Sequence, residues 1–290
     1  MLRIVAILFP VFALVLVGYS YGRRHRPDME VANRLNMQIF VPALVFDALS
    51  SREFDIVSYR WLALGGLLVV LGSGLLAWPV ASWLRYRPRA FVPPMMFNNS
   101  GNMGLPLAVL ALGEGGLAAA VVLFLVSNTL HFTLGIYLVG GAVSWGSLLT
   151  MPVNIALLAG LSTNLLGWRL PGFAQLPITM LGQIAIPLML FALGVRMVNI
   201  DLRAWRVGLA GAVVCPLSGL AVALTFGAAL PLDSLQFSAM VLFSALPPAV
   251  LNYLFAEEYR QQPATVASIV LIGNLVTVVT LPLALMFVLD

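Results

Sequence analysis

Charge is scarce in this sequence of 290 residues. Only 9% of the residues are charged, and lysine does not occur, so that all 15 basic residues are arginine. Soluble globular domains carry about 25% charged residues. With 61% hydrophobic residues and a mean hydropathy of +1.01, the chain has too much apolar surface to bury in one aqueous core. The composition excludes a soluble domain and predicts an integral membrane protein.

Cysteine is nearly absent as well. The single Cys215 lies in an apolar run, which predicts a small buried residue and excludes a disulfide framework or a cysteine metal site. No arginine cluster lies on a soluble segment, so the pI near 9.6 does not indicate a nucleic-acid partner. We expect no cofactor and no metal.

Long apolar runs are what the sequence has in abundance, and they are continuous, whereas a membrane β-barrel shows short alternating segments. At about 20 residues per span, they predict an all-α membrane protein with ten transmembrane helices. The first run is followed by Arg23, Arg24 and Arg26 and lacks a cleavage site, so we interpret it as a retained helix. The helices are expected near Arg3–Tyr21, Val31–Leu49, Trp61–Leu84, Phe91–Leu112, Leu117–Val139, Leu149–Trp168, Leu176–Val198, Ala204–Ala229, Leu235–Ala256 and Pro263–Leu289.

The arginines are distributed unevenly between the two sides of this arrangement. Eleven lie in or near the connections after odd-numbered helices, and four lie on the opposite side. Because cytoplasmic loops are enriched in arginine and lysine, the larger group is expected in the cytoplasm and both termini outside. The eleven are Arg23, Arg24, Arg26, Arg34, Arg85, Arg87, Arg89, Arg196, Arg203, Arg206 and Arg260, and the four are Arg3, Arg52, Arg60 and Arg169.

Two of the expected helices are interrupted. Met95–Pro106 (MMFNNSGNMGLP) combines asparagine, serine, glycine and proline between apolar sequences, and Pro247 and Pro248 interrupt the ninth helix. Non-helical backbone at membrane depth persists only where protein buries it or where it lines an aqueous cavity. A substrate site is one interpretation of Met95–Pro106, and a polar re-entrant loop or a kinked structural helix is the other.

The two halves of the chain resemble each other. Pro42 in VPALVFDAL corresponds to Pro187 in IPLMLFALG, and Asn128 corresponds to Asn274 in the fifth and tenth helices. Chance matches between prolines are the alternative explanation. Five helices per half would make the repeats, residues 1–143 and 147–290, enter the membrane from opposite sides. Inverted repeats with paired broken helices are typical of secondary transporters, whose substrate sites lie at the membrane midplane.

The sequences NNSGNMGLPLAVLALGEGGL (98–117), IPLMLFALGVRM (186–197) and ALPPAVLNYLFAEEY (245–259) resemble the auxin efflux carrier family, and the similarity covers essentially the whole chain. The resemblance implies a ten-helix fold similar to bile-acid symporters and sodium/proton antiporters. Helices 4 and 9 would cross at their broken centres, at residues 101–106 and 247–252. It also implies organic-anion substrates: auxin in plants, and malonate, malate and related carboxylates in bacteria. A homodimer is expected through the fold resemblance alone.

Without lysine, an anion site would use backbone N–H groups at half-helix N-termini, which carry partial positive charge, together with asparagine amides. The predicted substrate-binding residues are Asn98, Asn99, Ser100, Gly101, Asn102, Gly104, Pro106, Pro247, Pro248 and Asn252. Residues with a predicted coupling or supporting role are Asp47, Asn128, His131, Gln183 and Asn274.

Several of these residues have structural alternatives. Asp47 is either functional, as carboxylates inside membrane segments often are, or an interfacial residue beside Arg52. His131 would suit proton coupling, yet a hydrogen-bonded structural histidine is the commoner case. Asn128 and Asn274 could equally form interhelical hydrogen bonds. The coupling ion, proton or sodium, stays open.

The predicted function is a secondary carrier of small organic anions in the bacterial inner membrane, in contact with lipid and working by alternating access. A channel or a membrane sensor is the alternative. An intramembrane enzyme is disfavoured, because the spans contain no aspartate pair, histidine–glutamate metal motif or serine–histidine pair.

Overall fold

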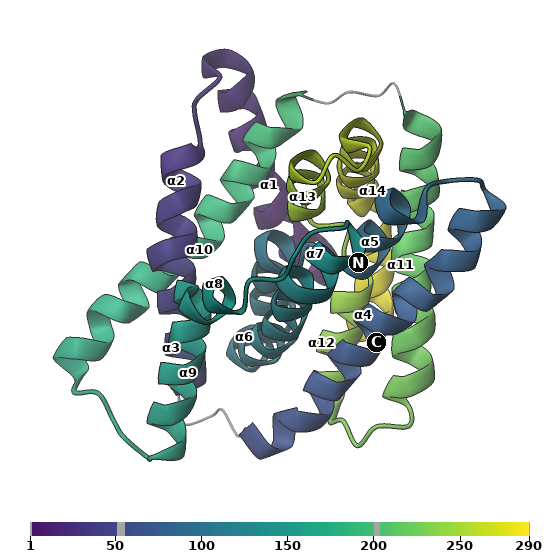
Figure 1. Ribbon diagram of the computed structural model, residues 1–290. Coiled ribbons are helices and arrows are strands. Elements are labelled where there is room, and N and C mark those ends of the chain that lie inside the picture. The colour runs from purple at the N-terminus through teal and green to yellow at the C-terminus, as the bar shows by residue number, and fades with distance from the viewer. Residues whose placement is uncertain (1, 51–55, 200–203, 290) are drawn as a thin grey trace.

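The computed structural model describes residues 2–50, 56–199 and 204–289, and within these ranges the chain is helical apart from turns and one isolated β-bridge (Figure 1). Six helical segments are long and apolar enough to cross a membrane, which confirms an all-helical, multi-pass membrane protein. They are Leu2–His25, Val57–Trp83, Ser100–Leu138, Gly172–Arg196, Trp205–Gly227 and Pro263–Leu289.

Helical residues occupy most of each of the ten expected ranges, with breaks inside Phe91–Leu112 and Leu235–Ala256. In the first half they are α1 (Leu2–His25), α2 (Glu30–Leu35), η1 (Asn36–Phe40), α3 (Val41–Ser50), α4 (Ile56–Trp83), α5 (Pro88–Met96), η2 (Ser100–Gly104), α6 (Leu105–Leu130), η3 (His131–Gly135) and α7 (Ile136–Leu138). In the second half they are α8 (Trp145–Thr150), α9 (Pro152–Leu165), α10 (Gly172–Arg196), η4 (Met197–Asn199), α11 (Trp205–Gly227), α12 (Ser234–Ser244), α13 (Leu251–Glu258) and α14 (Pro263–Leu289).

The predicted separation between the fourth and fifth helices falls inside α6. Ser100–Leu138 contains 39 residues, and at 1.5 Å per residue it would be roughly 58 Å long, about twice the thickness of a bilayer core. Gly113 interrupts it with φ 72° and ψ −158°, a conformation open mainly to glycine. Two helical segments therefore meet at Gly113.

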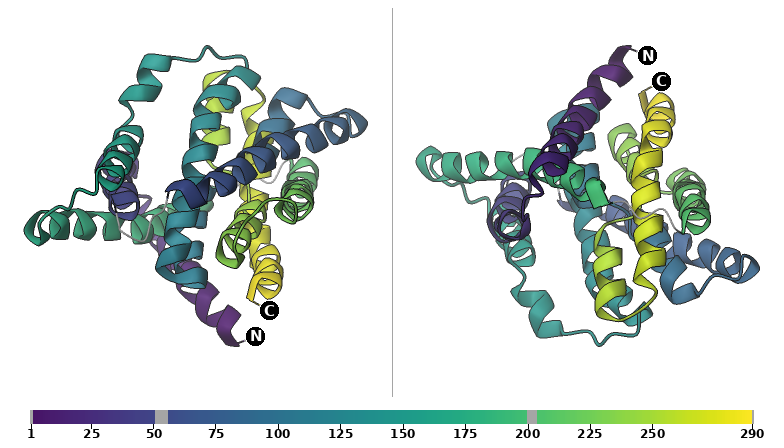
Figure 2. Two further views of the ribbon diagram at one scale, coloured as in Figure 1. Left: turned by 90° about the horizontal axis from the view of Figure 1, so that it is seen from below. Right: turned by 90° about the horizontal axis from the view of Figure 1, so that it is seen from above.

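The helices form two packed groups. The first contains α1, α3, α9 and α10, and the second contains α4, α5, α11, α12 and α14. The α6 helix packs on α4 and α12 and also contacts α1 and α3, so it lies between the groups, as Figure 1 shows. The start of α1 and the end of α14 lie close together in both views of Figure 2.

Glycines allow the closest helix contact, that between α1 and α10. A Cβ added at Gly194 would lie 2.0 Å from the Val15 carbonyl oxygen, and one added at Gly18 would lie 2.1 Å from that of Phe191. Both obstacles are backbone atoms, which cannot rotate away. Small residues thus hold the first group together, as is common where membrane helices pack.

Candidate functional site

Two helix breaks meet inside the bundle. The α5 helix ends at Met96 and α12 at Ser244, and the unwound residues that follow them pair in antiparallel fashion through a bridge between Asn98 and Pro248. The Asn99 N–H donates to the Pro247 carbonyl at 2.7 Å, and the Ala249 N–H donates to that of Phe97 at 2.9 Å. This pairing satisfies backbone groups that the broken helices leave free. We call this region the crossing.

Asparagine side chains fasten the crossing. Asn98 donates to the Phe243 carbonyl, and Asn252 Nδ2 donates to the Phe97 carbonyl at 2.8 Å. Asn99 Nδ2 donates to Asn274 Oδ1 at 3.1 Å, while Asn274 Nδ2 donates to the Pro248 carbonyl at 3.1 Å. Asn274 was predicted either to support the site or to form an interhelical hydrogen bond, and the structure contains the hydrogen bond.

The crossing lies earlier in the chain than the resemblance implied. The first paired segment is residues 97–99 and not 101–106, although the second, residues 247–249, falls inside the expected range. Pro106 lies at the start of α6, where proline is compatible with the helix because its missing N–H is not needed. Residues 100–104 form the π-helical turn η2. Pro106 therefore does not mark the break.

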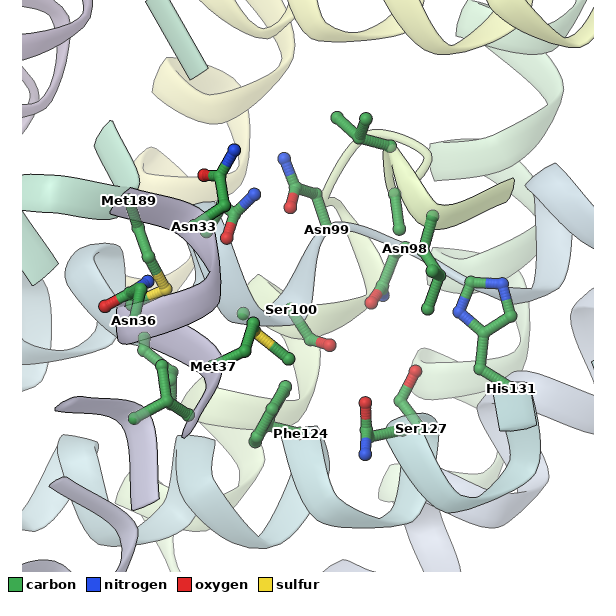
Figure 3. Close-up of a pocket in the computed structure, with 18 of the residues that line it drawn as sticks. Asn33, Asn36, Met37, Asn98, Asn99, Ser100, Phe124, Ser127, His131 and Met189 are labelled. Carbon is green, nitrogen blue, oxygen red and sulfur yellow. The ribbon is translucent and has the colours of Figure 1, made fainter. Parts of the chain in front are cut away.

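A cavity of about 190 Å³ lies beside the crossing, with walls from the first helix group (α3 and α10), η1, η2, α6, η3 and α13. In Figure 3, Asn36 and Met37 lie on one side of it and Asn98 and His131 on the other, with Ser100 between them and Phe124 and Ser127 rising from α6. Seven predicted site residues line the cavity: Asn98, Asn99, Ser100, Gly101, Asn102, Asn128 and His131.

All three π-helical turns in the described residues contribute to this cavity. η1 supplies Asn36 and Met37, η2 supplies residues 100–102, and η3 supplies His131 and Phe132. Such turns are rare inside helices and occur frequently at functional sites, because they redirect side chains that a regular helix would point elsewhere. Their convergence marks the cavity as the candidate site.

Buried polar atoms without a protein partner concentrate here. Among the described residues, the side-chain atoms of this kind include Asn36 Oδ1, Asn98 Oδ1, Asn128 Nδ2 and His131 Nε2, and all four residues line the cavity. A buried polar group without a hydrogen bond costs about 1–3 kcal/mol. The cavity is therefore suited to a polar ligand that completes these bonds.

His131 is held between aromatic rings. It stacks on Phe97 with ring centroids 4.2 Å apart and meets the Phe255 ring edge-on at 5.2 Å. The Asn252 side chain interacts with the imidazole, while Nε2 lacks a partner with hydrogen-bond geometry. The ring is fixed in position and keeps one nitrogen available to the cavity.

The other predicted residues lie outside the cavity lining. Gly104 packs against Leu246, Pro106 is buried in α6, and Pro247, Pro248, Asn252 and Asn274 build the crossing. Gln183 is exposed on α10. Asp47 accepts hydrogen bonds from Gln175 and, at 3.0 Å, from Thr179 Oγ1, and so ties α3 to α10. Arg52, its expected neighbour, lies outside the described residues.

Most of the other residues that line the cavity were not predicted from the sequence. Those with polar or sulfur-containing side chains include Asn33, Asn36, Ser127, Met189 and Arg196. Asn33 and Asn36 are three residues apart, the spacing that puts two side chains on one helix face, and this polar pair in an apolar run was a readable signal. Arg196 is the last residue of α10 and lines the cavity. For the predicted membrane orientation it was counted among the loop arginines.

A membrane-embedded helical bundle with two broken helices crossing beside a polar cavity has the architecture of a membrane transporter. The family model described as "Membrane transport protein" matches residues 3–142 and 136–285. The chain belongs to this membrane transport protein family, the family of auxin efflux carrier-like proteins, and is a transporter and not an enzyme.

Two relatives are similar over nearly their whole length. A protein of Rhizobium meliloti named "Putative malonate transporter" is 26% identical over 307 residues, covering 97% of this chain and 94% of the relative. A protein of Methanothermobacter thermautotrophicus named "Uncharacterized transporter" is 28% identical over 296 residues, covering 94% of each. The resemblance seen in the sequence motifs is thereby confirmed.

Proposed function

We propose that this protein is a secondary carrier that moves small organic anions, carboxylates such as malonate or malate, by alternating access. The observation that carries the proposal is the cavity beside the crossing, where unpartnered buried polar atoms of Asn36, Asn98, Asn128 and His131 converge. Its lining contains no carboxylate side chain among the described residues. Asn128 Nδ2 is a free donor, and the Asn36 amide can turn its N–H₂ toward an anion. The name of the Rhizobium relative is in keeping with a carboxylate substrate.

The proposal includes ten spans in two inverted five-helix repeats, residues 1–143 and 147–290. Three observations support it: the antiparallel pairing of the two breaks at Asn98 and Pro248, the interruption of α6 at Gly113, and the nearness of the start of α1 to the end of α14 in Figure 2. An even number of spans requires both chain ends on one side of the membrane.

Movement of the first helix group against the crossing would give alternating access. The cavity receives Val41, Met189 and Arg196 from α3 and α10 of this group, and the remaining walls come mainly from η1, the crossing, η2 and α6. A shift of the first group past the crossing would open the cavity first to one side of the membrane and then to the other.

His131 is our candidate for a coupling proton, because it lines the cavity and Asp47 does not. A sodium ion is the alternative. The bacterial inner membrane, the outward termini and a homodimer, which is expected only from the family resemblance, complete the proposal.

Counterflow tests the carrier mechanism. Purified protein in liposomes loaded with unlabelled malonate should accumulate external labelled malonate transiently above equilibrium, because a carrier exchanges substrate across the membrane. Initial rates should saturate with concentration. Labelled malonate that only equilibrates, without the transient excess, would indicate a channel, and the absence of any flux would favour a sensor.

A further inference from the structure

Arg196 brings the only formal positive charge to the cavity lining formed by the described residues. It is the last residue of α10 and lies two helical turns after Met189, which also lines the cavity. Side chains on a helix lean toward its N-terminus. The guanidinium therefore leans back along α10 in the direction of Met189.

No acidic side chain neutralises Arg196 among the described residues. The ion pair found there joins Arg34 to Glu30 on the exposed surface of α2. Glu257 shares a neighbouring cavity of about 540 Å³ with Arg196, but its carboxylate, which accepts a hydrogen bond from the Tyr253 hydroxyl at 3.0 Å, forms no ion pair with Arg196. A half-buried guanidinium without a carboxylate partner can bind an anionic ligand.

Two kinds of anion-binding group therefore face one cavity from different helices. Ser100 and Asn102 on η2 offer a neutral hydroxyl and amide, whereas Arg196 on α10 offers a charge. A guanidinium binds carboxylates in a bidentate manner, with two parallel N–H···O bonds. A ligand with a single carboxylate can satisfy only one of these two groups at a time.

We propose that the cavity selects dicarboxylates, with one carboxylate held by the Ser100 hydroxyl and the Asn102 amide on η2 and the second held by Arg196. This inference rests on the proposed carrier function and adds the residue that determines specificity. It accounts for the presence of an unpaired arginine beside a site that otherwise uses neutral donors. The competing explanation is that Arg196 only interacts with the C-terminal carbonyl groups of its own helix.

A matched pair of ligands tests the proposal on the purified full-length protein in detergent. Malonate and its monoamide, malonamate, have nearly the same shape, but malonamate carries one carboxylate. Calorimetric titration should give about ten- to hundredfold tighter binding of malonate, since hydrogen bonds to charged groups are worth roughly 1.5–3 kcal/mol. Arg196→Gln should lower malonate affinity by this factor and change malonamate affinity by less than about threefold.

Two further variants serve as controls. Arg34→Gln removes the same charge from exposed α2 and should leave both affinities unchanged. Arg196→Lys keeps the charge but lacks the planar fork, so that malonate should bind with intermediate affinity. The recovery should be larger for malonate than for malonamate, whereas a helix-end contact, which lysine can also make, would restore both affinities alike.

The outcomes separate this inference from the proposed function. If the parent binds malonate and malonamate equally, or if Arg196→Gln weakens both by the same factor, the dicarboxylate inference is wrong while a carboxylate site stands. If the parent binds neither ligand, nor acetate or succinate, the proposed function fails together with the inference.

Discussion

Asn99 and Asn274, which are 175 positions apart in the sequence, share a hydrogen bond of 3.1 Å from Nδ2 to Oδ1 inside the bundle. Asn274 also donates to the Pro248 carbonyl, so one side chain on α14 contacts both strands of the crossing. Both asparagines are buried. The crossing is thus fixed to α14 by side chains as well as by its own backbone pairing.

Replacing Asn274 by Ala should therefore loosen the crossing. The change leaves the Asn99 amide and the Pro248 carbonyl without these partners and should lower the free energy of unfolding by about 1–3 kcal/mol. Thermal melting of the purified protein in detergent measures this loss. Gln183→Ala, on the exposed face of α10, is the control and should melt like the parent. Equal melting of both variants would show that Asn274 does not hold the crossing.

The close contact between α1 and α10 predicts a second stability effect. Gly194→Val would drive Cβ into the Val15 backbone and should destabilise the protein by about 3 kcal/mol, near the upper end for overpacking. Gly172→Val, at the start of the same helix, meets no atom within 4 Å and is the matched control. Parent-like melting of Gly194→Val would contradict the packing of these two helices.

The helix break at the crossing was predictable from the sequence. The break after Met96 was predicted because asparagine, serine and glycine interrupt an apolar run. Such a polar interruption is unfavourable in lipid unless protein buries it or it lines an aqueous cavity. The break, at residues 97–99, lies inside the predicted stretch Met95–Pro106. Pro106 itself lies at the start of α6, where proline does not break a helix. The prolines in α5 (Pro93 and Pro94) precede the actual break.

Arg196 illustrates what the sequence could not reveal. An arginine at the end of an apolar run has the same pattern whether it enters a loop or turns back along its helix. Only the packing of α10 against η1 and η2 puts it at the cavity. Asp47 was a functional candidate in the sequence, but in the structure it accepts hydrogen bonds from Gln175 and Thr179. These partners lie more than 120 positions away, and no sequence pattern links them to Asp47.

Proton coupling through His131 predicts a change in pH dependence. If this imidazole carries the proton, His131→Gln should abolish the variation of transport rate between about pH 5 and 8, because glutamine cannot bind or release a proton in its place. Asp47→Asn, outside the cavity lining, should keep the parent profile. Initial uptake rates in liposomes across this range provide the measurement, and an unchanged profile for His131→Gln would exclude it as the proton carrier.

The arginine distribution predicts the orientation of the chain. Arg196 is the end of α10 and not part of a loop, but without it ten arginines still oppose four, so both termini are expected outside. A phosphatase fused after Asp290 should be active, since this reporter folds only outside the cytoplasm, and a fluorescent protein active only in the cytoplasm should be dark. The reverse result would overturn the topology.

The central claim is that the substrate carboxylate binds in the cavity beside the crossing, and the affinity of Asn102→Asp for malonate tests it most directly. Asn102 lines the cavity next to Gly101 and Ser100. A carboxylate there, about 4 Å from that of the ligand at an effective dielectric constant near 20, would repel it by roughly 4 kcal/mol. We predict an affinity loss on the order of a thousandfold, against about 1–3 kcal/mol for Asn102→Ala. Parent-like malonate affinity in a folded Asn102→Asp protein would contradict the claim.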